Sequence, residues 1–329
     1  MYQGVVILNK EPGFTSFDVV AVCRGIFGQR SVGHTGTLDP MARGVLPVCL
    51  GRATKLSDLL TSLEKEYEVE MELGRTTDTD DCTGQLLTEA DPECLNTVTE
   101  QAVREALLAH LGESLQVPPR YAAIKKDGKK LYEYARAGVE VEMPGRPVTI
   151  HEIRILEITL PKIRYQVRCS KGTYIRSLCR DVGAELGVGA FMTALSRNST
   201  GGFSLEEAVT LDQLKAAKEA GQLDRYVRPM DQLLTHFPAM QCLEEGRKFL
   251  LNGNPLRASV LKPMEDPARV QGTSGRDTES VASEDGVTLS DKAVCRVYLD
   301  GGLAALYRYD AGRRQFKNVK MLLERGNGN

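Results

Sequence analysis

The beginning of the chain combines a short apolar run with apolar positions at helical spacing. The run from Gly4 to Asn9, GVVILN, is rich in β-branched residues and predicts a strand. Thr15 or Ser16 can then cap a helix, whose apolar positions recur at helical spacing until Gly28, a residue typical of a helix C-cap. After a glycine-containing loop, the run Val45–Leu50 predicts a second strand.

The pattern continues to about residue 235 without a regular strand–helix–strand repeat. Residues 66–74, EYEVEMELG, alternate as a strand with one polar face does. Further helices are predicted over 53–63, 99–111, 131–137 and 174–186, and further strands over 154–160 and 162–169. Strands from distant parts of the chain with helices between them favour an α+β fold with a mixed or antiparallel sheet.

A domain boundary is expected near residues 236–238, which divides the chain into residues 1–236 and 237–329. Beyond the boundary, two short strands over 294–299 and 303–309 and a turn over 252–255 favour a small β-rich module. Within it, the segment 263–292 is too polar to build a core, and we expect a flexible insertion there.

Composition restricts the classes of protein that the chain can represent. The N-terminus lacks a basic start followed by a long apolar run, and no stretch approaches 18 uninterrupted apolar residues, so we expect a cytoplasmic protein without a membrane span. None of the eight cysteines forms a C-x-x-C pair, and the four histidines show no ligand spacing. We therefore expect free thiols and no metal site.

The charge of the chain is unevenly distributed. The net charge of −2 argues weakly against a nucleic-acid partner. Between Lys162 and Arg180, however, there are six basic residues and no acidic one. Such a strip can bind phosphates while acidic residues elsewhere hide it from the total.

The stretch GHTGTLDP, residues 33–40, is the first candidate for chemistry. Residues 28–35 differ from a phosphate-binding loop because His34 stands where the essential lysine belongs, which disfavours nucleotide binding. Asp39 can be a turn residue or a constrained catalytic carboxylate, since Pro40 disfavours the helical region for it. His34 could order the loop, contact phosphate or enter a nucleic-acid stack.

Two other stretches offer aromatic and basic groups. Tyr67 lies on a predicted strand, where packing is the usual role, but its ring could stack on a base and its hydroxyl could move a proton. The segment 170–176, SKGTYIR, places Lys171, Tyr174 and Arg176 around a glycine turn. It can be a solvated basic face, or a site for a carboxylate or a phosphate.

Taken in order, several stretches resemble the bacterial tRNA pseudouridine synthases of the TruB type. The resemblance covers about residues 4–235 and includes an opening at 10–16 (the family's K-P-x-G-x-[ST]-S, with Glu11 an inserted or shifted residue), the motif GHTGTLDPMARGVLPVCLGRATK at 33–55, and segments at 66–67, 73–84, 116–125, 132–138, 169–176, 194–197 and 202–203. The sequence departs from the family pattern at Arg43, where a small hydroxyl residue is usual, and at Ser196, where a second basic residue is usual. The tail from about residue 237 resembles a PUA module, an RNA-binding β-barrel.

This resemblance implies a pseudouridine synthase fold, with a mixed, largely antiparallel sheet, flanking helices and a small C-terminal β-barrel. It implies that the chain isomerises uridine 55 in the T loop of tRNA, with Asp39 as the essential nucleophile or base. Arg176 would pair with Asp39 and favour its charged form, Tyr67 would stack on the target base and could transfer a proton, and Leu195 would line the pocket.

The resemblance also implies a set of RNA contacts and partners. His34 would occupy the opened RNA loop, and the other candidate contacts are Lys10, Lys55, Lys171, Tyr174 and Arg197. The reaction needs no cofactor or metal, the partner is the T stem-loop of tRNA, and we expect a monomer. The alternative is a non-catalytic protein that binds or folds tRNA.

Overall fold

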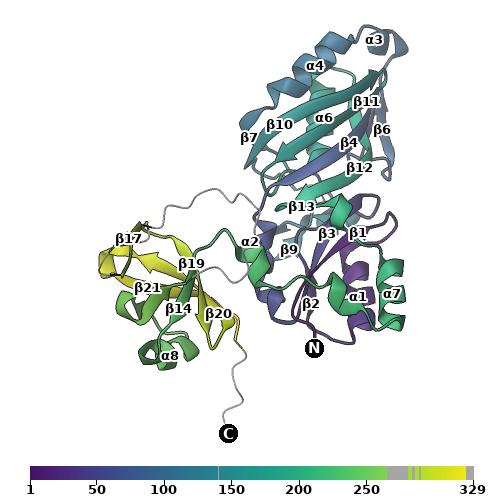
Figure 1. Cartoon of the computed structure of the whole chain (residues 1–329). Helices are drawn as coiled ribbons and strands as arrows, with labels where there is room; N and C mark the ends of the chain where they lie inside the picture. The colour runs from purple at the N-terminus through teal and green to yellow at the C-terminus, as the bar shows by residue number, and fades with distance from the viewer. Residues whose placement is uncertain (140, 265–280, 284–285, 289, 324–329) are drawn as a thin grey trace.

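A mixed sheet of nine strands forms the larger part of the molecule (Figure 1). The computed structural model describes residues 1–139, 141–264, 281–283, 286–288 and 290–323. The strands of the main path follow the order β1 (Gly4–Lys10), β3 (Arg43–Leu50), β12 (Ala190–Thr200), β4 (Lys65–Leu73), β11 (Lys162–Cys169), β10 (Arg146–Thr159) and β7 (Gly112–Gln116). Two short strands join it at the side, β2 (Val32–His34) on β3 and β13 (Phe203–Ser204) on β12. The expected α+β class is confirmed.

Within this sheet the pairs are antiparallel except at one place. The β12–β3 pair is parallel and short, and it places Arg197 opposite Gly44. Gly44 has a φ of 112°, and a Cβ there would collide with the backbone of Arg197. A glycine is therefore required where the strand after the GHTGTLDP loop meets β12.

The helices cover the sheet through apolar faces. Helix α1 (Ser16–Phe27) begins at a capping box between Thr15 and Asp18 and ends at Gly28 in the left-handed conformation, as the sequence predicts. It packs beside α7 (Leu211–Glu219) in one part of the sheet, while α4 (Glu100–Ala109) and α6 (Ile175–Glu185) cover another (Figure 1). The remaining short elements of this part are α2 (Ser57–Thr61), α3 (Pro92–Asn96), α5 (Leu131–Arg136), and the hairpins β5 (Arg75–Thr77) with β6 (Leu86–Glu89) and β8 (Lys125–Lys126) with β9 (Lys129–Lys130).

The helix expected over residues 53–63 is divided into two shorter elements. A 3-10 helix runs over Gly51–Leu56 before α2 begins. The hydroxyl of Thr54 donates to the carbonyl of Gly51 at 2.7 Å, and the hydroxyl of Ser57 donates to the carbonyl of Thr54 at 2.7 Å. Such local bonds compete with regular helix formation, which explains the difference.

A second sheet begins at Ala239 and has six strands, shown beside the main sheet in Figure 1. Its order is β15 (Leu256–Arg257), β21 (Gln315–Met321), β20 (Gly302–Asp310), β19 (Val294–Leu299), β14 (Ala239–Cys242) and β16 (Leu261–Pro263), with helix α8 (Glu244–Leu251) against it. Strands β17 (Val281–Ser283) and β18 (Gly286–Thr288) pair with each other. Most of the expected polar insertion over 263–292 lies outside the described residues.

The two sheets share a hydrophobic cluster. Residues of β1 and β3 pack in it together with Leu306 and Leu322 of the C-terminal part. Polar contacts reinforce the junction, because Arg52 donates to the carbonyl of Leu322 at 3.0 Å and Lys320 pairs with Asp58 at 3.1 Å. The second sheet thus contacts the segment that directly follows β3, the strand after the GHTGTLDP loop.

Candidate active site

Asp39 and Arg176 form a two-point ion pair between the glycine-containing loop and the first turn of α6. Nε of Arg176 lies 3.0 Å from Oδ2 of Asp39, and Nη2 donates to Oδ1 at 3.1 Å. The arginine side chain is 6% exposed, whereas the aspartate side chain is 31% exposed. A planar guanidinium therefore fixes the orientation of a carboxylate that still reaches the surface.

The other donors of Arg176 also have acceptors. Its Nη1 donates to the carbonyl of Thr79 at 3.1 Å, its Nη2 donates to the carbonyl of Tyr121 at 3.2 Å, and its Nη1 lies 3.6 Å from Oδ2 of Asp81. Asp81 is 5% exposed and accepts hydrogen bonds from the hydroxyl of Thr79, at 2.8 Å, and from the backbone of Thr83, at 2.9 Å. Sequence reasoning did not single out Asp81; the acidic run 78–81 is the signal that could have indicated it.

The electrostatics of Asp39 combine opposing effects. Burial raises the pKa of its carboxyl group above the ordinary value, Arg176 opposes that rise, and the nearby Asp81 adds to it. Arg176 acts in the expected direction, toward the charged form, but the effect of burial is the larger one. Asp39 is thus a more basic carboxylate than one in water.

Lys10 holds the loop that carries Asp39. It is 1% exposed, and its ammonium donates to the carbonyls of Glu11 at 3.0 Å, Pro40 at 3.2 Å and Ala42 at 2.6 Å. Burial lowers its pKa to about 8, although Asp39 acts to raise it. All three ammonium protons have acceptors inside the protein, so in this geometry Lys10 positions the loop.

Strands β4 and β12 place three candidate residues side by side. Tyr67 lies opposite Arg197, and Leu195 lies opposite Val69. All three candidates, Tyr67, Leu195 and Arg197, are less than one-tenth exposed. Burial raises the pKa of Tyr67 to about 12, which keeps its hydroxyl protonated at neutral pH.

Arg197 binds the backbone of the GHTGTLDP loop and of the strand that follows it. Its Nε donates to the carbonyl of Val45 at 2.7 Å and its Nη2 donates to the carbonyl of Gly36 at 3.2 Å. Gly36 has a φ of 79°, as a glycine at this turn can. Within the described ranges the buried Nη1 of Arg197 has no hydrogen-bond partner. Like Lys10, Arg197 is engaged with the backbone of the loop.

The remaining candidates lie around the loop and the start of α6. The imidazole of His34 contacts the ring of Phe17, and Nζ of Lys55 donates to the carbonyl of Met321 at 2.8 Å. Lys171 is exposed in the turn before α6. Tyr174 is the N-cap residue of α6, and its backbone exchanges two hydrogen bonds with the side chain of Gln116.

The arginines of the basic strip 162–180 are paired with carboxylates. Arg164 pairs with Glu68 and Glu157, and Arg168 pairs with Glu64 and Glu152. The carboxylates come from β4, from β10 and from the residue before β4, because strand pairing brings them beside β11. Arg176 and Arg180 are also paired, so only part of the strip is free for a ligand.

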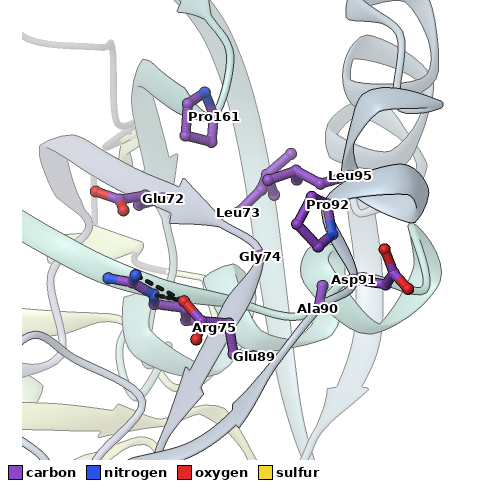
Figure 2. Close-up of a pocket in the computed structure, with 10 residues that line it drawn as sticks. All are labelled: Glu72, Leu73, Gly74, Arg75, Glu89, Ala90, Asp91, Pro92, Leu95 and Pro161. Carbon is purple, nitrogen blue, oxygen red and sulfur yellow. Dashed lines mark hydrogen bonds and ion pairs between the residues drawn. The ribbon is translucent and has the colours of Figure 1, made fainter.

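A hollow of about 700 Å³ lies away from these residues, at the ends of β4 and β6 (Figure 2). The Arg75–Glu89 ion pair bounds it on one side, and Pro92 and Leu95 of α3 bound it on another (Figure 2). It contains none of the candidate catalytic residues. This hollow is therefore separate from the candidate active site around Asp39.

The structure also bears on metal binding, membrane insertion and disulfide formation. Over the described ranges, no group of three or more histidine, cysteine or acidic side chains is arranged to hold a metal ion. No helix in the same part of the chain is long and apolar enough to cross a membrane. All eight cysteines are free.

The fold is shared with chains of solved complexes that contain Cbf5. Two crystal structures, of a Cbf5–Nop10–Gar1 complex and of an archaeal box H/ACA Nop10–Cbf5 complex, contain chains that superpose with a TM-score of 0.68 at 25% identity. The superpositions cover 98% of this chain and 85% and 87% of those chains, so both sheets share the likeness.

The sequence comparisons identify the family. The N-terminal domain of the TruB family of pseudouridylate synthases matches residues 24–175, and the C-terminal domain of tRNA pseudouridylate synthase B matches residues 176–235. The chain belongs to the TruB family. Relatives called tRNA pseudouridine synthase B from Burkholderia lata and Alkaliphilus oremlandii are each 44% identical, over 80% and 79% of this chain and 81% and 84% of those proteins.

Proposed function

We propose that this chain isomerises uridine 55 in the T loop of tRNA to pseudouridine, and that Asp39 is the essential residue. The observation that carries the proposal is the Asp39–Arg176 pair, in which a buried guanidinium orients a partly exposed carboxylate. Family membership and the names of the relatives support pseudouridine formation in tRNA.

The reaction breaks the N1–C1′ glycosidic bond, turns the base and joins C5 to C1′. The hydrogen on C5 is lost and a proton is placed on N1, so the product is an isomer of the substrate. Asp39 acts at the sugar, as a nucleophile at C1′ or as a base. A carboxylate with a raised pKa is suited to either role, since it is more basic than an ordinary one.

The surrounding residues prepare the base and the catalyst. The target uridine leaves its stack, at a cost of a few kcal/mol. The ring of Tyr67 supports the base, and its protonated hydroxyl is available to donate to it. Leu195 lines the other side, while Arg176 and Lys10 keep Asp39 in place through the bonds described above.

The wider RNA contacts follow from exposure and position. We assign the T stem-loop to the surface around His34, Lys171 and Tyr174, and assign residues 237–329 to a PUA-like RNA-binding module. Lys55 lies at the junction with that module, where it can bind the module's backbone and also contact RNA. We propose a cytoplasmic monomer that uses no cofactor.

The decisive experiment measures tritium release from an unmodified tRNA transcript labelled at C5 of uridine. Wild-type protein should release tritium, and a transcript with cytidine at position 55 should release none. Asp39→Asn should bind the transcript without turnover, whereas Asp212→Asn, a change at an exposed carboxylate of α7, should behave as wild type. Tight binding by wild type without any release would favour a non-catalytic tRNA-binding or tRNA-folding protein.

A further inference from the structure

Phe17 is an exposed aromatic ring close to the loop that carries Asp39. Its side chain is 69% exposed in the first turn of α1. One exposed apolar residue is ordinary on a protein surface. This one, however, contacts the imidazole of His34 edge to face, with ring centroids 5.3 Å apart and planes at 86°. The two residues form one aromatic pair.

The aromatic pair is fixed relative to Asp39. Ser16, next to Phe17, is buried, and its hydroxyl accepts a hydrogen bond from the backbone N–H of Leu38 at 3.0 Å and donates to the carbonyl of Leu38 at 3.3 Å. Leu38 directly precedes Asp39. The capping box at Thr15 makes the start of α1 rigid, so Phe17 is presented on a defined surface.

The aromatic pair carries no charge at neutral pH, so it can interact with a ligand by stacking but not by ion pairing. Burial and the nearby Arg197 lower the pKa of His34, which makes its imidazole neutral at neutral pH. In the described part of the chain its buried Nδ1 has no hydrogen-bond partner. A neutral imidazole beside an exposed phenyl ring is poorly suited to holding a phosphate and well suited to stacking on a base.

We propose that Phe17, held edge to face by His34, stacks against an unpaired base of the RNA substrate beside the target uridine. This inference rests on the proposed function for the identity of the RNA. An unpaired base in an RNA loop presents a flat face, and aromatic side chains are the usual partners of such faces. The contact adds affinity without adding a phosphate contact.

Steady-state kinetics with the labelled transcript test the contact. Phe17→Ala should raise KM by roughly 5- to 150-fold, the range that loss of one base–aromatic stack gives, with kcat changed less than threefold. Phe17→Tyr should restore KM, whereas Phe17→Leu, which keeps apolar volume without a π face, should not. Leu87→Ala, at an exposed apolar position on β6, should have no effect.

The salt dependence of RNA binding separates stacking from electrostatics. Phe17→Ala should lower affinity by the same factor at every salt concentration, so its plot runs parallel to that of wild type. Lys171→Ala should reduce the magnitude of the slope by about 0.7–0.9. A KM for Phe17→Ala within twofold of wild type, or full rescue by Phe17→Leu, would overturn the inference.

A spectroscopic test does not depend on turnover. The chain has no tryptophan, so Phe17→Trp introduces a single indole, which can be excited selectively at wavelengths where tyrosine does not absorb. Its emission should be quenched when a synthetic T stem-loop RNA is added, while that of Leu87→Trp should not. Quenching without tritium release from wild type would refute the proposed function and support the stack. Tritium release without quenching would support the proposed function and refute the stack.

Discussion

Substitution of Arg176 by lysine tests whether the geometry of its guanidinium, beyond its charge, holds Asp39. The guanidinium spans both carboxylate oxygens of Asp39, at 3.0 and 3.1 Å, and also reaches two backbone carbonyls. A lysine ammonium is a single point donor on a flexible stem and can replace at most one of the two bonds to Asp39. Complete removal of the charge is less informative, because it leaves buried Asp81 without its cation and risks unfolding.

The size of the expected effect follows from the bonds that are lost. A hydrogen bond to a charged group contributes about 1.5–3 kcal/mol, so the loss of one from Asp39 corresponds to roughly 10- to 150-fold. If the carboxylate also moves by about 1 Å, roughly 100-fold in rate is expected from misplacement alone. We therefore expect Arg176→Lys to lower kcat by about two orders of magnitude, with a smaller change in tRNA affinity.

Single-turnover tritium release at saturating enzyme measures the chemical step separately from binding. Arg180→Lys is the matched control, since Arg180 lies on the same helix and pairs with Asp80 and Asp181. Because Arg176 lowers the pKa of Asp39, a weaker contact should also move the acid limb of the rate profile to higher pH. A single-turnover rate within threefold of wild type with an unmoved acid limb would refute this reasoning.

Three further changes give distinct outcomes. Lys10→Met should lower kcat by roughly 10-fold or more because two carbonyls of the Asp39 loop, those of Pro40 and Ala42, lose their donor. The decline of wild-type activity above about pH 8, where Lys10 loses its proton, should be absent from the pH profile of this variant. Asp39→Asn should unfold thermally no earlier than wild type at pH 7. The raised pKa means that the folded state holds the proton of Asp39 more tightly, so wild type regains stability as pH falls and the difference should shrink in acid. Lys55→Met should leave the salt slope of tRNA binding unchanged if its bond to Met321 is its main role, and reduce the slope's magnitude by about 0.7–0.9 if it contacts a phosphate.

The sequence predicted the elements whose pattern is regular. Strand β4 alternates buried and more exposed positions without interruption, and helix α1 has a capping residue at each end. The predicted ends of both elements therefore lie within one residue of the observed ends. Strand β12 was not predicted. Two irregularities in its pairing with β4, between Met192 and Ala194 and between Arg197 and Ser199, break the alternation by which a strand is recognised.

The site was predicted in part for a similar reason. Asp39 and Arg176 are 137 residues apart, so local pattern could not join them, and the resemblance to a family supplied the pairing that the structure shows. Lys10 and Arg197 were expected to contact phosphates only because the resemblance implies RNA contacts there, and both are buried in the structure. Their acceptors include backbone carbonyls distant in sequence, up to 161 residues away, which no local rule indicates.

Because Lys10 and Arg197 bind the protein's own backbone, fewer basic residues are free to contact RNA, which affects how strongly RNA binding depends on salt. Two candidate phosphate contacts are engaged with the loop, and much of the basic strip is paired with carboxylates. Lys171, and Lys125 and Lys129 of the hairpin 125–130, KKDGKK, are among the basic residues that remain exposed. Each phosphate contact adds about 0.7–0.9 to the magnitude of the slope of log K against log salt. We expect Lys125→Ala with Lys129→Ala to lower that magnitude by about 1.4–1.8 in filter binding, and Arg164→Ala, a change at a paired residue, to leave it unaltered. An equal loss in both variants would mean that the paired arginines exchange their carboxylates for phosphates when RNA binds.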